Sequence, residues 1–290
     1  MYLSQDSFHT HPSLRSFLPS QVESLLEQGS NEINEDVVLA EDNIFGVFDG
    51  ATSLGERSAE MKKAGGFVAA TLAADTFRQT KPQKSLLDQA LVANRSLGAM
   101  QDETNFTENK RYNLWSTSIA VVRLQQDRLE FCQTGDSLIA ILYDDGSYSF
   151  PVPEVDIDRE TLALWKRRSN EESGRIHTLL ADQILKVRKK MNREYGVLNG
   201  EPRAAEFIRH GFCSLDGVRN VLLFTDGLFP PKEDPLEKTD WDSFVGLFRE
   251  GGLQALRNHV RTLQATDPFL RKYPRFKCHD DIGAVALSFA

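Results

Sequence analysis

Three acidic sites, far apart in the chain, stand where an apolar stretch typical of a buried strand begins or ends. They are Asp49 after residues 44–48, Asp226 after residues 221–225, and Asp280, with Asp281 beside it, before residues 282–289. An acid at the end of a core strand is held on a rigid element and still lies close to water. Carboxylate oxygens gathered in this way are the ligands that a hard divalent cation prefers.

Glycine follows the acid at two of these sites, as Gly50 after Asp49 and Gly227 after Asp226. A glycine here lets the backbone carbonyl turn toward whatever the carboxylate holds. One strand followed by Asp-Gly is usually only a turn, so a single copy is weak evidence. Two copies, together with a third acidic site beside another strand, favour a metal site over unrelated turns.

The preceding strand carries two more acids. The pattern of polar and apolar residues over 32–40 predicts a strand that contains Glu35 and Asp36. Residues 41–43 are expected to form a tight turn before the strand of Asp49. The two strands are expected to form a hairpin, which brings Glu35 and Asp36 toward the level of Asp49.

The composition predicts a soluble globular protein. Of the 290 residues, 40% are apolar and 26% are charged, which is enough for a sizeable core. The net charge of -8 disfavours a general nucleic-acid binder, because neutralising phosphates needs a basic face. No window approaches the ~20 apolar residues of a membrane helix. Residues 1–11 lack the basic and apolar stretches of a secretory signal.

The three cysteines, Cys132, Cys213 and Cys278, are widely spaced and odd in number. They form neither a CxxC pair nor a disulfide framework, so we expect a reducing, cytoplasmic location. The histidines show no HExxH spacing, so that zinc-binding motif is not indicated.

The apolar periodicity predicts several helices and a group of sequential strands. Helices are expected at residues 20–28, 53–77, 85–101, 175–193 and 240–249, and a further one, after a break at Gly251-Gly252, ends near Ala265. A short helix is expected after Pro202 and ends at Gly211. Strands are expected at residues 116–124, 128–133, 138–143 and 148–152, in addition to those beside the acids. Short turns between these strands indicate sequential hairpins and an antiparallel sheet.

Capping residues and glycines refine the helices. Ser53 with Glu56, and Ser85 with Asp88, have the spacing of capping boxes. The paired glycines at 65–66 lie inside a helix and cost stability unless a neighbour approaches closely, so this helix is expected to lie tight on a sheet.

Residues 153–217 are polar, mostly helical in pattern and less regular than the rest. The helix expected at 175–193 contains four basic residues near its end: Lys186, Arg188, Lys189 and Lys190. Basic residues there favour the helix macrodipole, and a role facing phosphate or an acidic substrate is the second interpretation. Because no linker separates domains, we expect one domain over residues 1–290, with a helical insertion or flap at about 153–217.

The order of the motifs adds a resemblance to a known family. The set comprises Asn34-Glu35-Asp36, residues 45–50 (FGVFDG), Ser116-Thr117, Gly135-Asp136-Ser137, residues 223–228 (LFTDGL) and residues 280–283 (DDIG). In this order and spacing, over residues 31–290, the set resembles the metal-dependent protein phosphatases of the PP2C (PPM) family, bacterial type. The resemblance implies an α+β fold: a four-layer α-β-β-α sandwich of two central antiparallel sheets flanked by helices.

The same resemblance implies roles for the acids. Asp49 is similar to the acid that bridges two metals, and Gly50 to the residue whose carbonyl joins the second metal. Asp226 and Asp280 are similar to the remaining ligands of the first metal, which makes Asp49, Asp226 and Asp280 the implied catalytic set. The other implied positions are Glu35 and Asp36, which would hold metal-bound waters, and Asp136, which with Asp226 would hold a third, weaker metal. The implied cofactor is Mn2+ or Mg2+, two ions with a possible third.

The implied reaction is hydrolysis of a phosphomonoester, with phosphoserine or phosphothreonine in a protein as substrate. Two cations ~3.5–4 Å apart can share one water and lower its pKa enough to give a bridging hydroxide that attacks phosphorus in line. No covalent enzyme intermediate is needed in this reaction. A phosphorylated protein is the expected partner of a monomeric chain, with no nucleic acid and no membrane.

Two positions depart from the family pattern. Asn31 stands where members usually carry an arginine that grips the phosphoryl group, and Ala51 stands where eukaryotic members carry a histidine proposed as general acid. A metal-bound water could act as the acid. Arg57, Lys62 or a basic residue of the segment 153–217 could bind phosphate.

Two other functions compete with this one. A haloacid-dehalogenase-type phosphatase needs a second acid two residues after the first, but Asp49 is followed by Gly50 and Ala51. A degenerate PP2C-like domain that binds a phosphoprotein or regulates a partner is the non-enzymatic alternative. The departures at Asn31 and Ala51 favour it weakly. Clustered carboxylates argue against it, because a pure binding module gains nothing from their repulsion.

Overall fold

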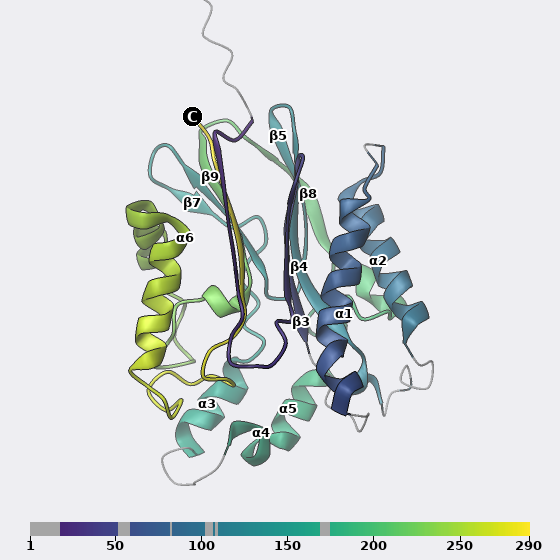
Figure 1. Cartoon of the computed structure of the whole chain (residues 1–290), viewed down its shortest axis with the longest axis vertical. Coiled ribbons are helices and arrows are strands. Elements are labelled where there is room, and N and C mark those ends of the chain that lie inside the picture. Colours follow the sequence, from purple (N-terminus) through teal and green to yellow (C-terminus); the bar gives the residue numbers. More distant parts are fainter. Residues whose placement is uncertain (1–17, 52–58, 82, 102–106, 108–109, 169–174) are drawn as a thin grey trace, which may run out of the picture.

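A computed structural model describes residues 18–51, 59–81, 83–101, 107, 110–168 and 175–290 of the chain. Two five-stranded antiparallel sheets stack face to face, with helices on both outer faces (Figure 1). One sheet has the order β1 (Gln21–Glu27), β10 (Ile282–Ser288), β9 (Val218–Phe224), β6 (Leu138–Tyr143) and β7 (Tyr148–Ser149). The other has the order β2 (Asp36–Glu41), β3 (Ile44–Ala51), β4 (Ser116–Gln125), β5 (Arg128–Thr134) and β8 (Arg209–Ser214). The predicted α-β-β-α sandwich is therefore confirmed.

Strand β3 shows why its sequence is apolar at nearly every position. Phe45 and Val47 pack between the two sheets, while Ile44 and Phe48 pack against the helices on the outer face. Successive side chains of a strand point to opposite faces, and both faces of this sheet are covered. A continuous apolar run is the result, and Asp49 follows where this burial ends.

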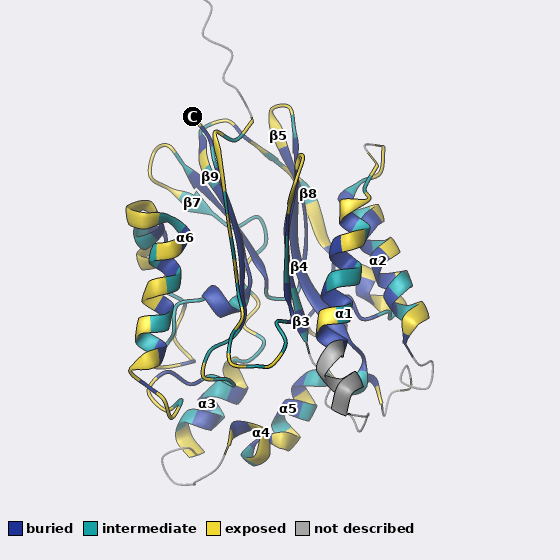
Figure 2. Ribbon diagram, viewed as in Figure 1, coloured by how far each residue is buried: buried dark blue, intermediate teal, exposed yellow. Residues whose placement is uncertain are grey.

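Helices α1 (Ala59–Arg78) and α2 (Leu86–Met100) cover the β3 sheet, and α6 (Trp241–Ala265) covers the β9 sheet. Figure 2 shows the buried side of each helix turned toward the strands. The predicted capping box of Ser85 with Asp88 is present. The box predicted at residues 53–56 lies outside the described residues.

The paired glycines of α1 are needed because the helix touches the sheet. A Cβ on Gly66 would lie 2.8 Å from the carbonyl carbon of Gly50 in β3, and a Cβ on Gly65 would meet the ring of Trp115. The prediction that this helix lies tight on a sheet is confirmed. Within the described residues, no helix is long and apolar enough to cross a bilayer.

Three short helices lie at one end of the sandwich, below the ends of both sheets (Figure 1). They are α3 (Arg159–Arg168), α4 (Ile176–Leu179) and α5 (Ala181–Arg188). The described residues also contain the 3-10 helices η2 (Arg111–Asn113), η3 (Pro202–Glu206) and η4 (Asp226–Leu228).

Four local predictions are wrong. Residues 20–28 form strand β1 because they pair along the whole length of β10, a long-range contact that overrides local helix propensity. The helix expected at 175–193 is divided at Leu180, where the backbone leaves helical geometry. Gly211 lies inside strand β8, which was missed. Strands β5 and β6 are not a hairpin, because the chain crosses between sheets at residues 135–137.

Candidate active site

The predicted acids meet at the end of the sandwich that faces α3, α4 and α5. Residues of both sheets line one cavity of about 430 Å3 there. Six of the seven predicted metal positions contribute to its lining: Glu35, Asp49, Gly50, Asp136, Asp226 and Asp280. Strand ends converge at this edge, so acids that are distant in sequence share one space.

Asp36, the seventh position, lies directly opposite Asp49 in the β2–β3 ladder but does not line the cavity. Its Oδ2 accepts a 2.7 Å hydrogen bond from the hydroxyl of Thr225, at the end of β9 in the other sheet. The backbone N–H of Thr225 donates in turn to the carbonyl of Gly283. Asp36 therefore ties the two sheets together behind the cavity.

Asp281 also holds backbone in place. Its Oδ1 accepts from the N–H of Gly29 at 2.7 Å, and its Oδ2 accepts from the N–H of Glu35 at 2.9 Å. Both oxygens are occupied by these bonds, whereas the neighbouring Asp280 lines the cavity. The assignment of Asp280 as the ligand stays a prediction, and Asp281 has a separate task in holding the backbone.

Mutual repulsion marks the acids as a cluster. Burial and then the charges of nearby aspartates, Asp36 first, raise the pKa of Asp49 well above its ordinary value. Burial and then the charge of Asp280 do the same to the pKa of Asp226. Burial also raises the pKa of Asp136. Carboxylates that disfavour one another's ionisation are stabilised by a cation placed among them.

The predicted donor set fits a hard divalent cation, because it consists of carboxylates and the Gly50 backbone. Two buried hydroxyls that line the cavity, Ser116 Oγ and Thr161 Oγ1, have no hydrogen-bond partner among the described residues. As the side chains stand, no three acidic, histidine or cysteine residues in the described ranges form a finished ligand set.

Lys277 places a positive charge against this cluster. Its Nζ lies 2.7 Å from Oδ1 of Asp280, and it lines the same cavity. Burial lowers the pKa of Lys277, but the carboxylates of Asp280, Asp49 and Asp281 together outweigh burial and raise it. The ammonium therefore stays charged and occupies one oxygen of Asp280.

The two family departures are part of the cavity. Asn31 and Ala51 both line it, so a neutral amide and a methyl group stand where the family has an arginine and a histidine. Arg57, one suggested phosphate-binding residue, lies outside the described residues, as does the side chain of Lys62.

The helical side of the cavity supplies residues that motif analysis missed. Among them are Asp158, Thr161, His177, Arg188 and Tyr195. Burial and then the charge of Asp136 raise the pKa of Asp158 to about 7. None of these residues belongs to a recognisable motif, and the only signal in the sequence was the basic end of the helix that contains Arg188.

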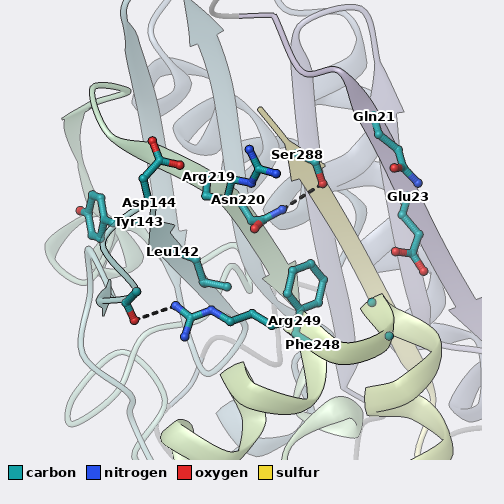
Figure 3. A pocket seen from close by; sticks show the side chains of 13 residues that line it. Gln21, Glu23, Leu142, Tyr143, Asp144, Arg219, Asn220, Phe248, Arg249 and Ser288 are labelled. Atoms are coloured by element: carbon teal, nitrogen blue, oxygen red, sulfur yellow. Dashed lines mark hydrogen bonds between the residues drawn. The ribbon is translucent and has the colours of Figure 1, made fainter. Parts of the chain in front are cut away.

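A larger hollow of about 950 Å3 lies elsewhere, beside Gly251 and Gly252, where the backbone of α6 leaves helical geometry (Figure 3). Arg249 crosses it and donates to the carbonyl of Gly146 at 2.7 Å, and Asn220 donates to Ser288 at 2.9 Å. None of the seven predicted metal positions lines it. The chemistry therefore belongs to the smaller cavity.

Comparison with known proteins agrees with this arrangement. A family model described as Protein phosphatase 2C matches residues 28–266. The chain belongs to the protein phosphatase 2C family. The matched range contains Asp49, Asp136 and Asp226, and the geometry of the cavity adds Asp280 beyond it. No curated protein matches the chain.

Solved structures of the same fold support the family. The serine/threonine phosphatase PstP/Ppp of Mycobacterium tuberculosis is 16% identical, with 93% of this chain and 98% of that chain covered and a TM-score of 0.55. The PPM Ser-Thr phosphatase MsPP of Mycobacterium smegmatis, in complex with cacodylate, is 15% identical, with 94% and 100% covered and a TM-score of 0.54. The catalytic domain of PstP in complex with 2 manganese ions is 14% identical, with 92% and 97% covered and a TM-score of 0.53. At these identities the likeness shows a shared fold.

Proposed function

We propose that the chain hydrolyses phosphomonoesters with Mn2+ or Mg2+ as cofactor, and that its substrates are phosphoserine and phosphothreonine in proteins. One observation carries the proposal: Asp49, Asp226 and Asp280, from different strands of both sheets, line one cavity in a member of the protein phosphatase 2C family. The similar structures of PstP/Ppp and MsPP are serine/threonine phosphatases, which supports the substrate class.

Within this proposal, Asp49, Asp226 and Asp280 hold two cations, with the backbone of Gly50 beside them. Bound cations supply a water of lowered pKa and neutralise charge on the phosphoryl oxygens. Asp136 and Asp226, which share the cavity, are the residues placed to hold a third, weaker cation. Glu35 is held by the N–H donated to Asp281, and Asp36 positions Asp49 across the β2–β3 ladder.

The proposal is tested by hydrolysis of a phosphopeptide panel, with serine, threonine and tyrosine forms, and of p-nitrophenyl phosphate. We expect activity with Mn2+ or Mg2+, none with a chelator, and a preference for the serine and threonine forms. Asp226→Asn removes one ligand and should lower kcat/KM at least about a thousandfold. Asp127→Asn, at an exposed turn between β4 and β5, is the matched control and should behave as the parent.

Two outcomes would overturn this assignment. Hydrolysis by Asp226→Asn at the parent's rate would show that the ligands are misassigned. A folded parent that binds phosphopeptides but hydrolyses none of them with any divalent cation would favour the non-enzymatic, phosphoprotein-binding alternative.

A further inference from the structure

The cavity contains few candidates for binding a phosphoryl group. Among the described residues that line it, Arg188 and Lys277 are the arginine and lysine side chains. The two lie close enough to His177 that their charges, after burial, lower the pKa of its imidazole. Both cations therefore face a common space beside the acidic cluster.

The ammonium group of Lys277 already has an ion-pair partner. Its Nζ forms the 2.7 Å ion pair with Asp280 and thereby neutralises a residue of the acidic cluster. Arg188 is half-buried at the end of α5, and its side chain takes part in none of the hydrogen bonds and ion pairs found among the described residues. The nearby carboxylates that feel its charge are Asp136 and Asp158, neither of which is paired with it.

The other basic residues of this helix end point elsewhere. Lys186 and Lys189 are exposed and do not line the cavity, and Lys190 pairs with Glu194 at 2.8 Å. The macrodipole accounts for basic residues at a helix end, but it does not account for Arg188 alone lining the cavity.

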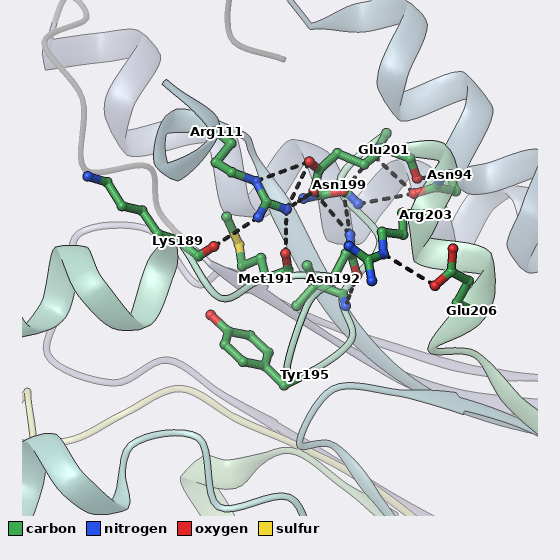
Figure 4. Close-up of polar contacts among 12 residues, drawn as sticks. Asn94, Arg111, Lys189, Met191, Asn192, Tyr195, Asn199, Glu201, Arg203 and Glu206 are labelled. Carbon is green, nitrogen blue, oxygen red and sulfur yellow. Dashed lines mark hydrogen bonds and ion pairs between the residues drawn. The ribbon is translucent and has the colours of Figure 1, made fainter. Parts of the chain in front are cut away.

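A buried arginine fixes the position of Arg188. Arg111 donates to the carbonyl of Lys189 at 2.8 Å and to the carbonyl of Met191, which follow Arg188 in the chain (Figure 4). It also pairs with Glu201 at 2.6 Å, and its side chain is only 3% exposed. The backbone at the end of α5 is therefore held in place, so this segment does not have to be ordered when Arg188 binds a ligand.

We propose that Arg188 binds the phosphoryl group of the substrate, in place of the arginine that Asn31 replaces. This inference rests on the proposed function. A guanidinium can donate two parallel hydrogen bonds to phosphoryl oxygens, and it is less strongly hydrated than an ammonium. Ile184 and Val187 of the same helix line the cavity and would contact the residue that carries the phosphate.

The test compares Arg188→Gln and Arg188→Lys with the parent and with Lys186→Gln, a charge-matched control on the exposed side of α5. Arg188→Gln should raise KM for a phosphopeptide, and the inhibition constant of inorganic phosphate, roughly tenfold to a hundredfold. Arg188→Lys should recover part of the loss, because it keeps the charge but not the bidentate geometry. Lys186→Gln should change neither constant, and Mn2+ affinity should be the same in all four proteins.

Unchanged KM and phosphate inhibition in Arg188→Gln would overturn the inference while leaving the proposed function in place. A joint loss of Mn2+ affinity and folding stability would also overturn it, because Arg188 would then be a structural counter-ion of Asp136 and Asp158. If the parent hydrolyses no phosphopeptide, the proposed function fails separately. Phosphopeptide binding then decides the inference: weaker binding by Arg188→Gln supports it, and equal binding overturns it.

Discussion

The two sides of the cavity are built in different ways. On the sheet side, Asp49, Asp226 and Asp280 stand beside strands whose backbone ladders fix their positions. On the helical side, Arg188 stands on a two-turn helix whose end is held by the side chain of Arg111. Backbone ladders leave a regular apolar pattern in the sequence, whereas a side-chain clamp leaves none. The acidic residues of the sheet side can therefore be predicted from motifs, whereas the residues of the helical side can be assigned only from the structure.

Two ion pairs, one on each side of the molecule, allow the comparison between the helical side and the sheet side to be tested experimentally. Arg111 pairs with Glu201 at the helical side, and Arg123 pairs with Glu130 between β4 and β5, with both arginine side chains under 10% exposed. Replacing either arginine by methionine leaves its glutamate, buried for Glu130 and half-buried for Glu201, without an ion-pair partner, and should lower the free energy of unfolding by about 3–5 kcal/mol. Only Arg111→Met should also raise KM for a phosphopeptide, because only Arg111 holds the end of α5.

Denaturant unfolding and steady-state kinetics of the two variants measure these effects. An equal rise of KM in both would show that general loss of stability, and not the clamp, governs substrate binding. An unchanged KM in a folded Arg111→Met would show that the end of α5 is positioned without it.

A smaller effect on stability is expected from Asp158, which lines the cavity on its helical side and feels the charge of Asp136. Its pKa of about 7 in the folded protein lies above the ~3.9 of an unfolded chain, so the folded state binds the proton more tightly. Stability therefore falls as the pH rises from about 4 to about 7, and Asp158→Asn removes this loss. In the presence of a chelator, the stability of the parent relative to the variant should fall by on the order of 2 kcal/mol over this range, a value reduced because the side chain is half-buried.

Urea unfolding of parent and variant near the two ends of that pH range makes the measurement. Parallel curves of stability against pH for the parent and the variant would contradict this prediction. They would mean that burial and the charge of Asp136 do not raise the pKa of Asp158. If the variant instead loses stability relative to the parent as the pH rises, the pKa of Asp158 is lowered on folding, and repulsion between Asp158 and Asp136 is excluded.

Much of the fold could be predicted because local signals agree with tertiary ones. Ser85 and Asp88 form their capping box, Gly65 and Gly66 lie against the sheet, and the apolar run before Asp49 is a strand covered on both faces. Strand β1 was misjudged because the sequence QVESLLE fits a short helix equally well, and only its pairing with β10 decides the matter.

The rest of the site escaped prediction for a similar reason. Four basic residues lie near the end of α5, and their order does not reveal which one lines the cavity. That choice depends on Arg111 and Glu201, which lie in distant parts of the chain. Asp36 and Asp281 had visible motifs, but their hydrogen bonds to Thr225, Gly29 and Glu35 could not be inferred from them.

Calorimetric titration of the chelator-treated protein with Mn2+ tests the central claim most directly. If the carboxylates of both sheets hold cations together, the parent binds at least two Mn2+ per chain. Asp49→Asn or Asp226→Asn then loses binding while its circular dichroism stays that of the parent. Absence of binding by the folded parent at millimolar Mn2+, or undiminished binding by both variants, would contradict the account.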